Sequence, residues 1–366
     1  MNVKKLNDIC LNITDGTHST VKDDNKGSGY LLSCKNVKDG KIIFDENDRK
    51  INDSTLSQLR KRTKMSIGDV VLTTVGTIGE SSIINFDNPI FEFQRSVAIL
   101  KANSSLILPE YLHYFFVSQI GQSSIKSRIK GAAQPCLFLN DLKDIEINLP
   151  FLSNQQHIVN TIGSVDNLIE NINKQNEKLM HIGLMLINSL NDSLEHKKLL
   201  VICELIKGFE IGSQNYIETS IDESLIHYLR VGDLLSLGGT FVEPSDELMM
   251  CTDDDILIAF DGAPGRNAVG LEGAYSSGIY KVKCNTKYKG LIYFEINSEL
   301  NQKIIKDHSQ GTTILHASKA IPFLETAKTD DRCVKKLNTL FERIIQNKRK
   351  LKLLVNEKRL LLSKYF

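Results

Sequence analysis

The chain has little that would mark a secreted, membrane-bound or metal-dependent protein. Its 366 residues include no tryptophan, 7 prolines and 7 cysteines, and no two cysteines form a C-x-x-C pair. The odd and scattered cysteines indicate neither a disulfide framework nor a zinc site. There is no apolar run long enough to span a bilayer, and the N-terminus lacks the apolar core of a signal peptide, so we expect a cytoplasmic protein without a membrane partner.

A charge excess of either sign is also missing. The net charge is +1, with 24% charged and 41% hydrophobic residues, which is typical of an ordinary globular protein. A protein that coats nucleic acid by bulk attraction usually carries a large positive excess, but local basic patches are compatible with near neutrality. Such patches occur at residues 60–64, 126–130 and 348–359. A solvated helix face is the simpler interpretation of the last one.

The motifs that would carry catalysis are absent as well. The sequence has no G-x-x-x-x-G-K-[ST] loop, and the glycine turns near Gly76 and Gly262 lack the acidic signature of a nucleotide fold. Asp15 and His18 are spaced as a base and its orienting group, but no nucleophile stands beside them. The acidic run 253–255 resembles a metal cluster, although it also fits a turn before a strand. We therefore predict no catalytic residue, no metal ligand and no cofactor on this chain.

One four-residue motif occurs twice. Leu149-Pro150-Phe151-Leu152 returns as Ile321-Pro322-Phe323-Leu324, at an offset of 172 residues, and each copy precedes a segment with apolar residues in steps of three and four. This spacing predicts two coiled-coil helices, with Asn176 and Lys348 at equivalent polar positions. The predicted seam consists of Ile162, Val165, Ile169, Ile172, Asn176, Leu179, Val334, Leu337, Phe341, Ile344, Lys348 and Leu351.

The stretch before each helix repeats more weakly. An apolar strand segment runs into the glycine turn 76–79 and again into the turn 262–265, at an offset of 186 residues. Gly131-Ala132-Ala133 corresponds to Gly311-Thr312-Thr313, at an offset of 180 residues. The fall of the offset towards 172 predicts that the second half has lost residues just before its helix.

Together these patterns predict an α+β protein with two similar lobes and two long helices. Strands are expected in both halves, with helices starting at Pro109 and spanning about Leu291 to Lys306. Each long helix of roughly 36 residues would extend about 54 Å. If the two helices pair antiparallel, they relate the lobes by an approximate two-fold axis. The expected domains are residues 1–150, 151–195, 196–325 and 326–366, which are lobe 1, helix 1, lobe 2 and helix 2.

At this point the chain resembles a known family, the specificity subunits of type I restriction-modification systems. The resemblance covers nearly the whole chain, and its order and duplication are more specific than any single motif. The motifs that carry it are Asp15-Gly16-Thr17-His18, Gly131-Ala132-Ala133-Gln134 followed by Leu137, residues 141–150, Gln155-Gln156-His157-Ile158-Val159 and residues 311–319. The second half shows Ala327-Lys328 where Gln155-Gln156 would be expected.

The resemblance implies a non-catalytic subunit with two target-recognition domains. Each would read one part of a split double-stranded DNA sequence, and the two helices would hold two modification (methyltransferase) subunits and then restriction subunits. S-adenosylmethionine, ATP and magnesium would belong to those partners. In agreement, neither half contains the Asn-Pro-Pro-aromatic motif that resembles an adenine methyltransferase site.

Candidate DNA contacts follow from what base edges and phosphates require. Arg and Lys bind guanine acceptors and phosphates, Asn and Gln pair with adenine, and glycine turns allow close approach. The candidates are Thr77, Arg95, Lys126, Arg128, Lys130, Gln134, Arg266, Asn267, Lys303, Lys306, Thr312, His316 and Lys319. For each residue alone, a solvated surface side chain remains the simpler interpretation. Two other functions stay open: a coiled-coil scaffold that binds proteins without DNA, and a stand-alone nuclease, for which the sequence offers no adequate site.

Overall fold

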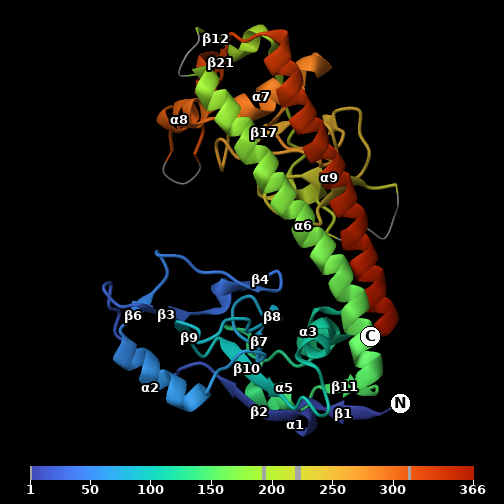
Figure 1. Ribbon diagram of the computed structural model, residues 1–366. Coiled ribbons are helices and arrows are strands. Elements are labelled where there is room, and N and C mark those ends of the chain that lie inside the picture. The colour runs from blue at the N-terminus through green and yellow to red at the C-terminus, as the bar shows by residue number, and fades with distance from the viewer. Residues whose placement is uncertain (1, 192–194, 219–223, 312–314) are drawn as a thin grey trace. The chain divides into compact units, whose positions relative to one another are not determined.

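Two compact units make up the chain, of which this computed structural model describes residues 2–191, 195–218, 224–311 and 315–366. Unit 1 contains residues 1–167 and 355–366, and unit 2 contains residues 168–354. Each unit holds one sheet-rich lobe and segments of two long helices, α6 (Leu152–Asn191) and α9 (Asp331–Tyr365), the green and red helices of Figure 1. None of the helices in the described ranges is long and apolar enough to cross a membrane.

Lobe 1 contains a four-stranded and a three-stranded sheet and several short helices. Its elements are β1 (Val3–Lys5), α1 (Leu6–Ile9), β2 (Cys10–Asp15), β3 (Gly29–Leu32), β4 (Val37–Lys38), β5 (Lys41–Ile42), β6 (Lys50–Ile51), α2 (Asp53–Thr63), β7 (Val70–Thr73), β8 (Ser81–Ile83), β9 (Phe91–Phe93), β10 (Val97–Ala102), α3 (Pro109–Val117), α4 (Gln119–Lys126), α5 (Leu139–Lys143) and β11 (Glu146–Asn148). The larger sheet has the order β2-β10-β7-β8, and the smaller has the order β6-β3-β9.

The central strand β10 explains where the core of lobe 1 sits. It pairs antiparallel with both β2 and β7, and the residues Val97 to Leu100 are at most 1% exposed. Both faces of β10 are therefore covered, which is why the segment reads as a continuous apolar run rather than as an alternating one. Ala98 and Leu100 contact one apolar cluster, whereas Val97 and Ile99 contact another that also contains Phe91.

Helix α3 joins this lobe to the unit 1 segments of α6 and α9. The helix begins with Pro109 at its first position, as expected. The Tyr114 hydroxyl donates to Asp166 of α6 at 2.9 Å, and the Lys358 ammonium of α9 lies 2.6 Å from the same carboxylate. The Phe366 ring lies 4.9 Å from the Tyr111 ring. The start of α6 and the end of α9 are thus fixed against the same short helix.

Lobe 2 repeats the plan of lobe 1. Its elements are β12 (His196–Lys198), β13 (Cys203–Lys207), β14 (Ile226–Leu229), β15 (Phe241–Val242), β16 (Met250–Cys251), β17 (Leu257–Ala259), β18 (Asn267–Ala268), β19 (Gly273–Tyr275), β20 (Ile279–Cys284), α7 (Lys289–Ile296), α8 (Glu299–Asp307) and β21 (Glu325–Ala327). The sheet order β13-β20-β17-β18 matches β2-β10-β7-β8. The parallel pair β14-β19 matches β3-β9, and the antiparallel pair β12-β21 matches β1-β11.

The single helix expected near Leu291 to Lys306 is two helices, α7 and α8. The break occurs at Ser298, which has extended backbone angles and whose side chain accepts a hydrogen bond from the Asn301 N–H at 3.3 Å. Ser118 separates α3 from α4 in the same way and accepts from the Gly121 N–H at 3.1 Å. Serine caps a helix start well, and these two caps occupy equivalent positions in the lobes.

The Pro-Phe-Leu motifs are not equivalent, which corrects the offset of 172 residues. Pro150 follows strand β11, whereas Pro322 lies in the 3₁₀ helix Ser318–Phe323 and precedes strand β21. The equivalent backbone bonds run from the Leu6 N–H to the Ile145 carbonyl at 2.9 Å and from the Leu199 N–H to the Leu324 carbonyl at 2.8 Å. The offset there is 179 residues, so almost nothing is lost before the second helix.

The two offsets differ by seven residues, which is one heptad. A heptad pattern is self-similar, so an alignment can slip by one repeat and still match apolar residues to apolar residues. The predicted equivalence of Asn176 and Lys348 depended on that slip, and it is wrong. With the structural offset, Ile169 is the counterpart of Lys348.

Most of the predicted seam residues are buried within their own unit. Ile162, Val165, Ile172, Val334, Leu337, Phe341 and Ile344 are at most 5% exposed, and Ile169, Asn176, Leu179 and Leu351 are half-buried. Lys348 is exposed, which corrects its assignment to the seam. The polar seam residue of α9 is Asn347, which is 4% exposed and donates to the Asn176 side-chain oxygen at 2.8 Å. Lys348 instead lies over Gly270 of lobe 2.

Candidate nucleic-acid interface

Two loops that are distant in sequence lie side by side at one edge of lobe 1. The turn after β7 contains Gly76 and Gly79, both with positive φ, and Cys136 of the later loop forms isolated bridges with Val75 and with Lys130. The Leu137 N–H donates to the Thr74 carbonyl at 2.9 Å. The loop that carries the Gly131 motif is therefore held against the β7 turn by backbone hydrogen bonds.

The Asp15-Gly16-Thr17-His18 loop approaches the same edge. A Cβ on Gly16 would lie 2.1 Å from the Phe93 carbonyl oxygen, so only glycine allows this backbone approach. Arg62 donates to the carbonyl oxygens of Asp15 and Gly16. The His18 imidazole lies 2.6 Å from the Asp15 carboxylate, and the His18 side chain is 61% exposed. The pair faces solvent, with no nucleophile bonded to it in the described contacts.

These loops enclose a cleft of about 300 Å³. It is lined by Asp15, His18, Thr74, Val75, Arg95, Gln134, Cys136, Leu137, Phe138 and Leu139. The structure thus brings the predicted residues Arg95 and Gln134 together, whereas Thr77 is exposed on the β7 turn. Burial raises the pKa of the Cys136 thiol, which keeps it protonated and unreactive.

The three basic residues before the Gly131 turn differ in what their charges contact. Arg128 donates to the Ser124 carbonyl at 3.0 Å, and Lys130 pairs with Asp141 at 2.5 Å. Lys126 is exposed and forms no ion pair among the residues that the structure describes. Arg128 and Lys130 therefore support the local fold, and Lys126 is the cation of this group that is free to meet an external anion.

Lobe 2 contains the same arrangement of loops. Gly262 and Gly265 have positive φ, and His316 forms isolated bridges with Asp261 and with Gln310. The Ala317 N–H donates to the Phe260 carbonyl at 2.7 Å. These contacts stand at the predicted offsets of 186 and 180 residues from their counterparts in lobe 1. The repeated loop frame, defined as these bridged turns, is thus present in both lobes.

A glutamine fixes the frame to the helix beside it, and the sequence did not predict this residue. In each lobe, a glutamine of α4 or α8 donates to the carbonyl of the second turn glycine and to a carbonyl at the end of the preceding helix. The contacts are Gln122 to Gly79 (2.9 Å) and Phe116 (2.7 Å), and Gln302 to Gly265 (3.1 Å) and Ile296 (2.8 Å). Their common offset of 180 residues was the signal that could have revealed them.

The predicted residues of lobe 2 also differ in how much of each side chain is available. Asn267 exchanges amide hydrogen bonds of 3.0 Å with Asn297, and Arg266 donates to the Val231 carbonyl at 3.3 Å. Lys303 and Lys306 are exposed on α8. Lys319 lies 3.4 Å from the Gln310 side chain, and the exposed His316 ring lies 2.8 Å from Asp261. Thr312 lies outside the described residues.

The other polar clusters that the sequence singled out are internal to the fold. Asp253, Asp254 and Asp255 form ion pairs with Arg349, Lys289 and Lys281, respectively. In the described ranges, no group of three His, Cys, Asp or Glu side chains is arranged to hold a metal ion. Arg60 of the first basic run is paired with the fully buried Glu92. These charges are used within the protein.

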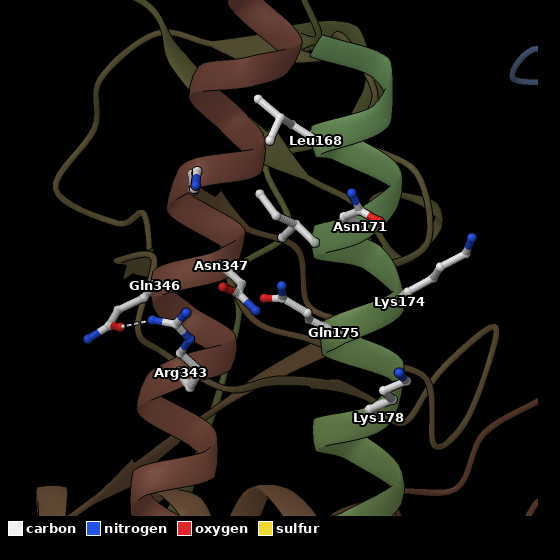
Figure 2. Close-up of a pocket in the computed structure, with 10 residues that line it drawn as sticks. Leu168, Asn171, Lys174, Gln175, Lys178, Arg343, Gln346 and Asn347 are labelled. Atoms are coloured by element: carbon white, nitrogen blue, oxygen red, sulfur yellow. Dashed lines mark hydrogen bonds between the residues drawn. The ribbon is translucent and has the colours of Figure 1, made fainter. Parts of the chain in front are cut away.

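A polar groove separates α6 from α9 within unit 2. Its volume is about 530 Å³, and it is lined by Leu168, Asn171, Ile172, Lys174, Gln175, Lys178, Arg343, Gln346, Asn347 and Lys350. Figure 2 shows Gln175 and Asn347 pointing toward each other across it, with Arg343 bonded to Gln346 at 3.3 Å. The lining contains four cations and no carboxylate. The groove therefore favours a polar or anionic surface.

Comparisons with known proteins agree on one family. Residues 1–181 match the family described as Type I restriction modification DNA specificity domain. The chain is 28% identical over 172 residues to the type I restriction enzyme EcoBI specificity subunit of Escherichia coli, covering 47% of this chain and 35% of that protein. It is 29% identical over 248 residues to the MjaIX specificity subunit of Methanocaldococcus jannaschii, covering 67% of this chain and 54% of that protein.

A solved structure shows the same fold over the whole chain. The crystal structure of the type I restriction-modification S subunit from M. genitalium matches with a TM-score of 0.53 and 16% identity, covering 100% of this chain and 96% of that chain. At this identity the match supports the architecture alone. The aligned segments span about one third and one half of the E. coli and M. jannaschii proteins.

Proposed function

Because residues 1–181 form a type I restriction modification DNA specificity domain, we propose that this chain is the specificity subunit of a type I restriction-modification system. It reads a double-stranded DNA target in two parts, one with each lobe, and performs no chemistry itself. The observation that carries this proposal is the repeated loop frame, which presents the bridges Val75–Cys136 and Asp261–His316 at equivalent edges of two similar lobes. Two such edges suit a target with two half-sites.

The DNA-contacting side chains are those that remain exposed near the two loop frames. In lobe 1 we assign this role to Thr77, Arg95, Lys126 and Gln134, and in lobe 2 to Lys303, Lys306, His316 and Lys319. The lysines contact phosphates, and the Gln, Arg and His side chains contact base edges, because those groups match the donors and acceptors of the major groove. Arg128, Lys130, Arg266 and Asn267 support the loops through their internal contacts.

The partners follow from the same proposal. Two modification subunits dock along α6 and α9, where the groove between the helices offers carboxamides and cations. Restriction subunits then join the modification subunits. S-adenosylmethionine, ATP and magnesium are bound by those partners in the cytoplasm. The domains are residues 1–150 and 196–325 for recognition and 151–195 and 326–366 for the helices.

A map of methylated adenines in the host genome tests this function. Deletion of the gene should abolish methylation at one bipartite motif and leave other motifs unchanged. The complex with the modification subunits should bind a duplex that carries the motif with an affinity that falls steeply with salt, because each phosphate contact adds about 0.9 to the slope of log K against log salt. An unchanged methylation map would contradict the proposal. Salt-independent binding of protein partners alone would favour a scaffold.

A further inference from the structure

The two loop frames share their backbone but carry different side chains at one pair of positions. In lobe 1 the bridged pair is Val75 and Cys136, and in lobe 2 it is Asp261 and His316. The exchange of backbone bonds with the residue six positions earlier is the same, at 3.0 and 2.8 Å for Cys136 and for His316. A fixed backbone with variable side chains is what a reading position requires.

In lobe 2 the pair forms a specific contact. The His316 Nδ1 lies 2.8 Å from the Asp261 Oδ1, with the imidazole side chain 60% exposed and the carboxylate side chain 23% exposed. An ionised carboxylate only accepts, so Nδ1 carries the hydrogen of this bond. The neutral ring then has its lone pair on Nε2, on the side away from Asp261. The exposed atom of the ring is therefore an acceptor.

The backbone around His316 leaves the ring little freedom to choose another partner. The Gly262 N–H donates to the Leu315 carbonyl at 2.8 Å, next to the His316 bridges. His316 is thus held through its own backbone, through its neighbour and through its Nδ1. A ring constrained at all three points presents Nε2 in one direction, which is the preorganisation that selective recognition needs.

We propose that Asp261 and His316 form a specificity-determining pair, in which Asp261 positions the ring and the His316 Nε2 accepts a hydrogen bond from an exocyclic amino group in the major groove. Adenine N6 and cytosine N4 carry such groups, whereas the major-groove edges of guanine and thymine offer no hydrogen-bond donor. The pair thus selects an amino-bearing base on one strand, at one position of the half-site that lobe 2 reads. This inference rests on the proposed function.

The alternative role for an exposed histidine is a phosphate contact. A phosphate contact requires a donor, so it would involve the protonated ring and would carry no information about the base. The two roles predict different results when the lobe 1 residues are placed at these positions. Loss of a base contact changes the preference at one position, whereas loss of a phosphate contact weakens all sequences alike.

The experiment measures sequence preference of the full-length chain, in complex with its modification subunits, on a duplex library randomised in both half-sites. We expect D261V, H316C and the double variant each to lose the preference for adenine or cytosine at one position of one half-site. The loss should be on the order of 10-fold, the lower range for a base contact. D261N should retain most of the preference, because the carboxamide oxygen still accepts from Nδ1. Exposed His181 on α6 offers the control H181N, with an unchanged profile.

Three results would overturn the pair. They are an unchanged profile in H316C, a uniform loss of affinity without a change of base preference, and a preference for guanine or thymine at the affected position. A wild-type complex without any sequence preference would overturn the proposed function itself. That outcome is distinguishable, because it is seen before any variant is tested.

Discussion

Two glycines of helix α6 predict opposite effects of the same substitution. A Cβ on Gly183 would lie 2.1 Å from Cε1 and 2.4 Å from Cδ1 of Phe294, whose ring is fully buried in the lobe 2 core. A Cβ on Gly163 would meet only the Tyr114 hydroxyl, at 3.5 Å. Alanine stabilises a helix interior by about 1 kcal/mol relative to glycine. G163A should therefore raise the stability of unit 1.

In G183A, overpacking against Phe294 costs about 1–3 kcal/mol and exceeds the gain in helix propensity. We expect a net loss of about 1 kcal/mol in unit 2, or roughly 2–4 °C in Tm for a unit of this size. Because the chain has no tryptophan, hydrogen exchange with mass spectrometry is the measurement that resolves the two units. G163A should slow exchange in α3, and G183A should speed it in α7. Stabilisation by both variants would refute the close packing of α6 on α7.

Two further predictions concern buried charge in lobe 1. R60M leaves the fully buried Glu92 without its cation, and urea unfolding should show a loss of about 3 kcal/mol, whereas the exposed neighbour variant K61A should change stability by less than about 0.5 kcal/mol; equal effects would contradict the buried pair. Burial, with a smaller contribution from Lys358, lowers the pKa of His113 to about 4. Its contribution to stability is therefore complete above the unfolded value of about 6.5 and is lost as the pH falls toward 4. H113Q should flatten the pH dependence of unfolding in that window, and an unchanged profile would argue against the burial of His113.

Much of the fold was predictable because its signals are local. The glycine turns, the apolar strand β10 and Pro109 at the start of α3 each depend on residues close in sequence. The lobes repeat at the offsets that the turns indicated. The long helices were predictable for the same reason, since the spacing of their apolar residues repeats over many turns.

The errors arose where a local pattern was ambiguous or where a distant residue decided. The heptad pattern allowed a slip of one repeat, which placed Lys348 in the seam in place of Asn347. Asn267 and Arg128 have side chains suited to DNA, but contacts with Asn297 and Ser124 occupy them. No sequence pattern distinguishes such a side chain from a free one, because the partner is chosen by the tertiary fold.

Exchange of lobe 1 is the most direct test of the central claim that each lobe reads one half of a split target. Residues 1–150 would be replaced by the equivalent lobe of a related specificity subunit, and the methylated motif would be mapped in a host that supplies the modification subunits. We predict that one half of the motif changes while the other half keeps its sequence. A change in both halves, or in neither, would contradict the account.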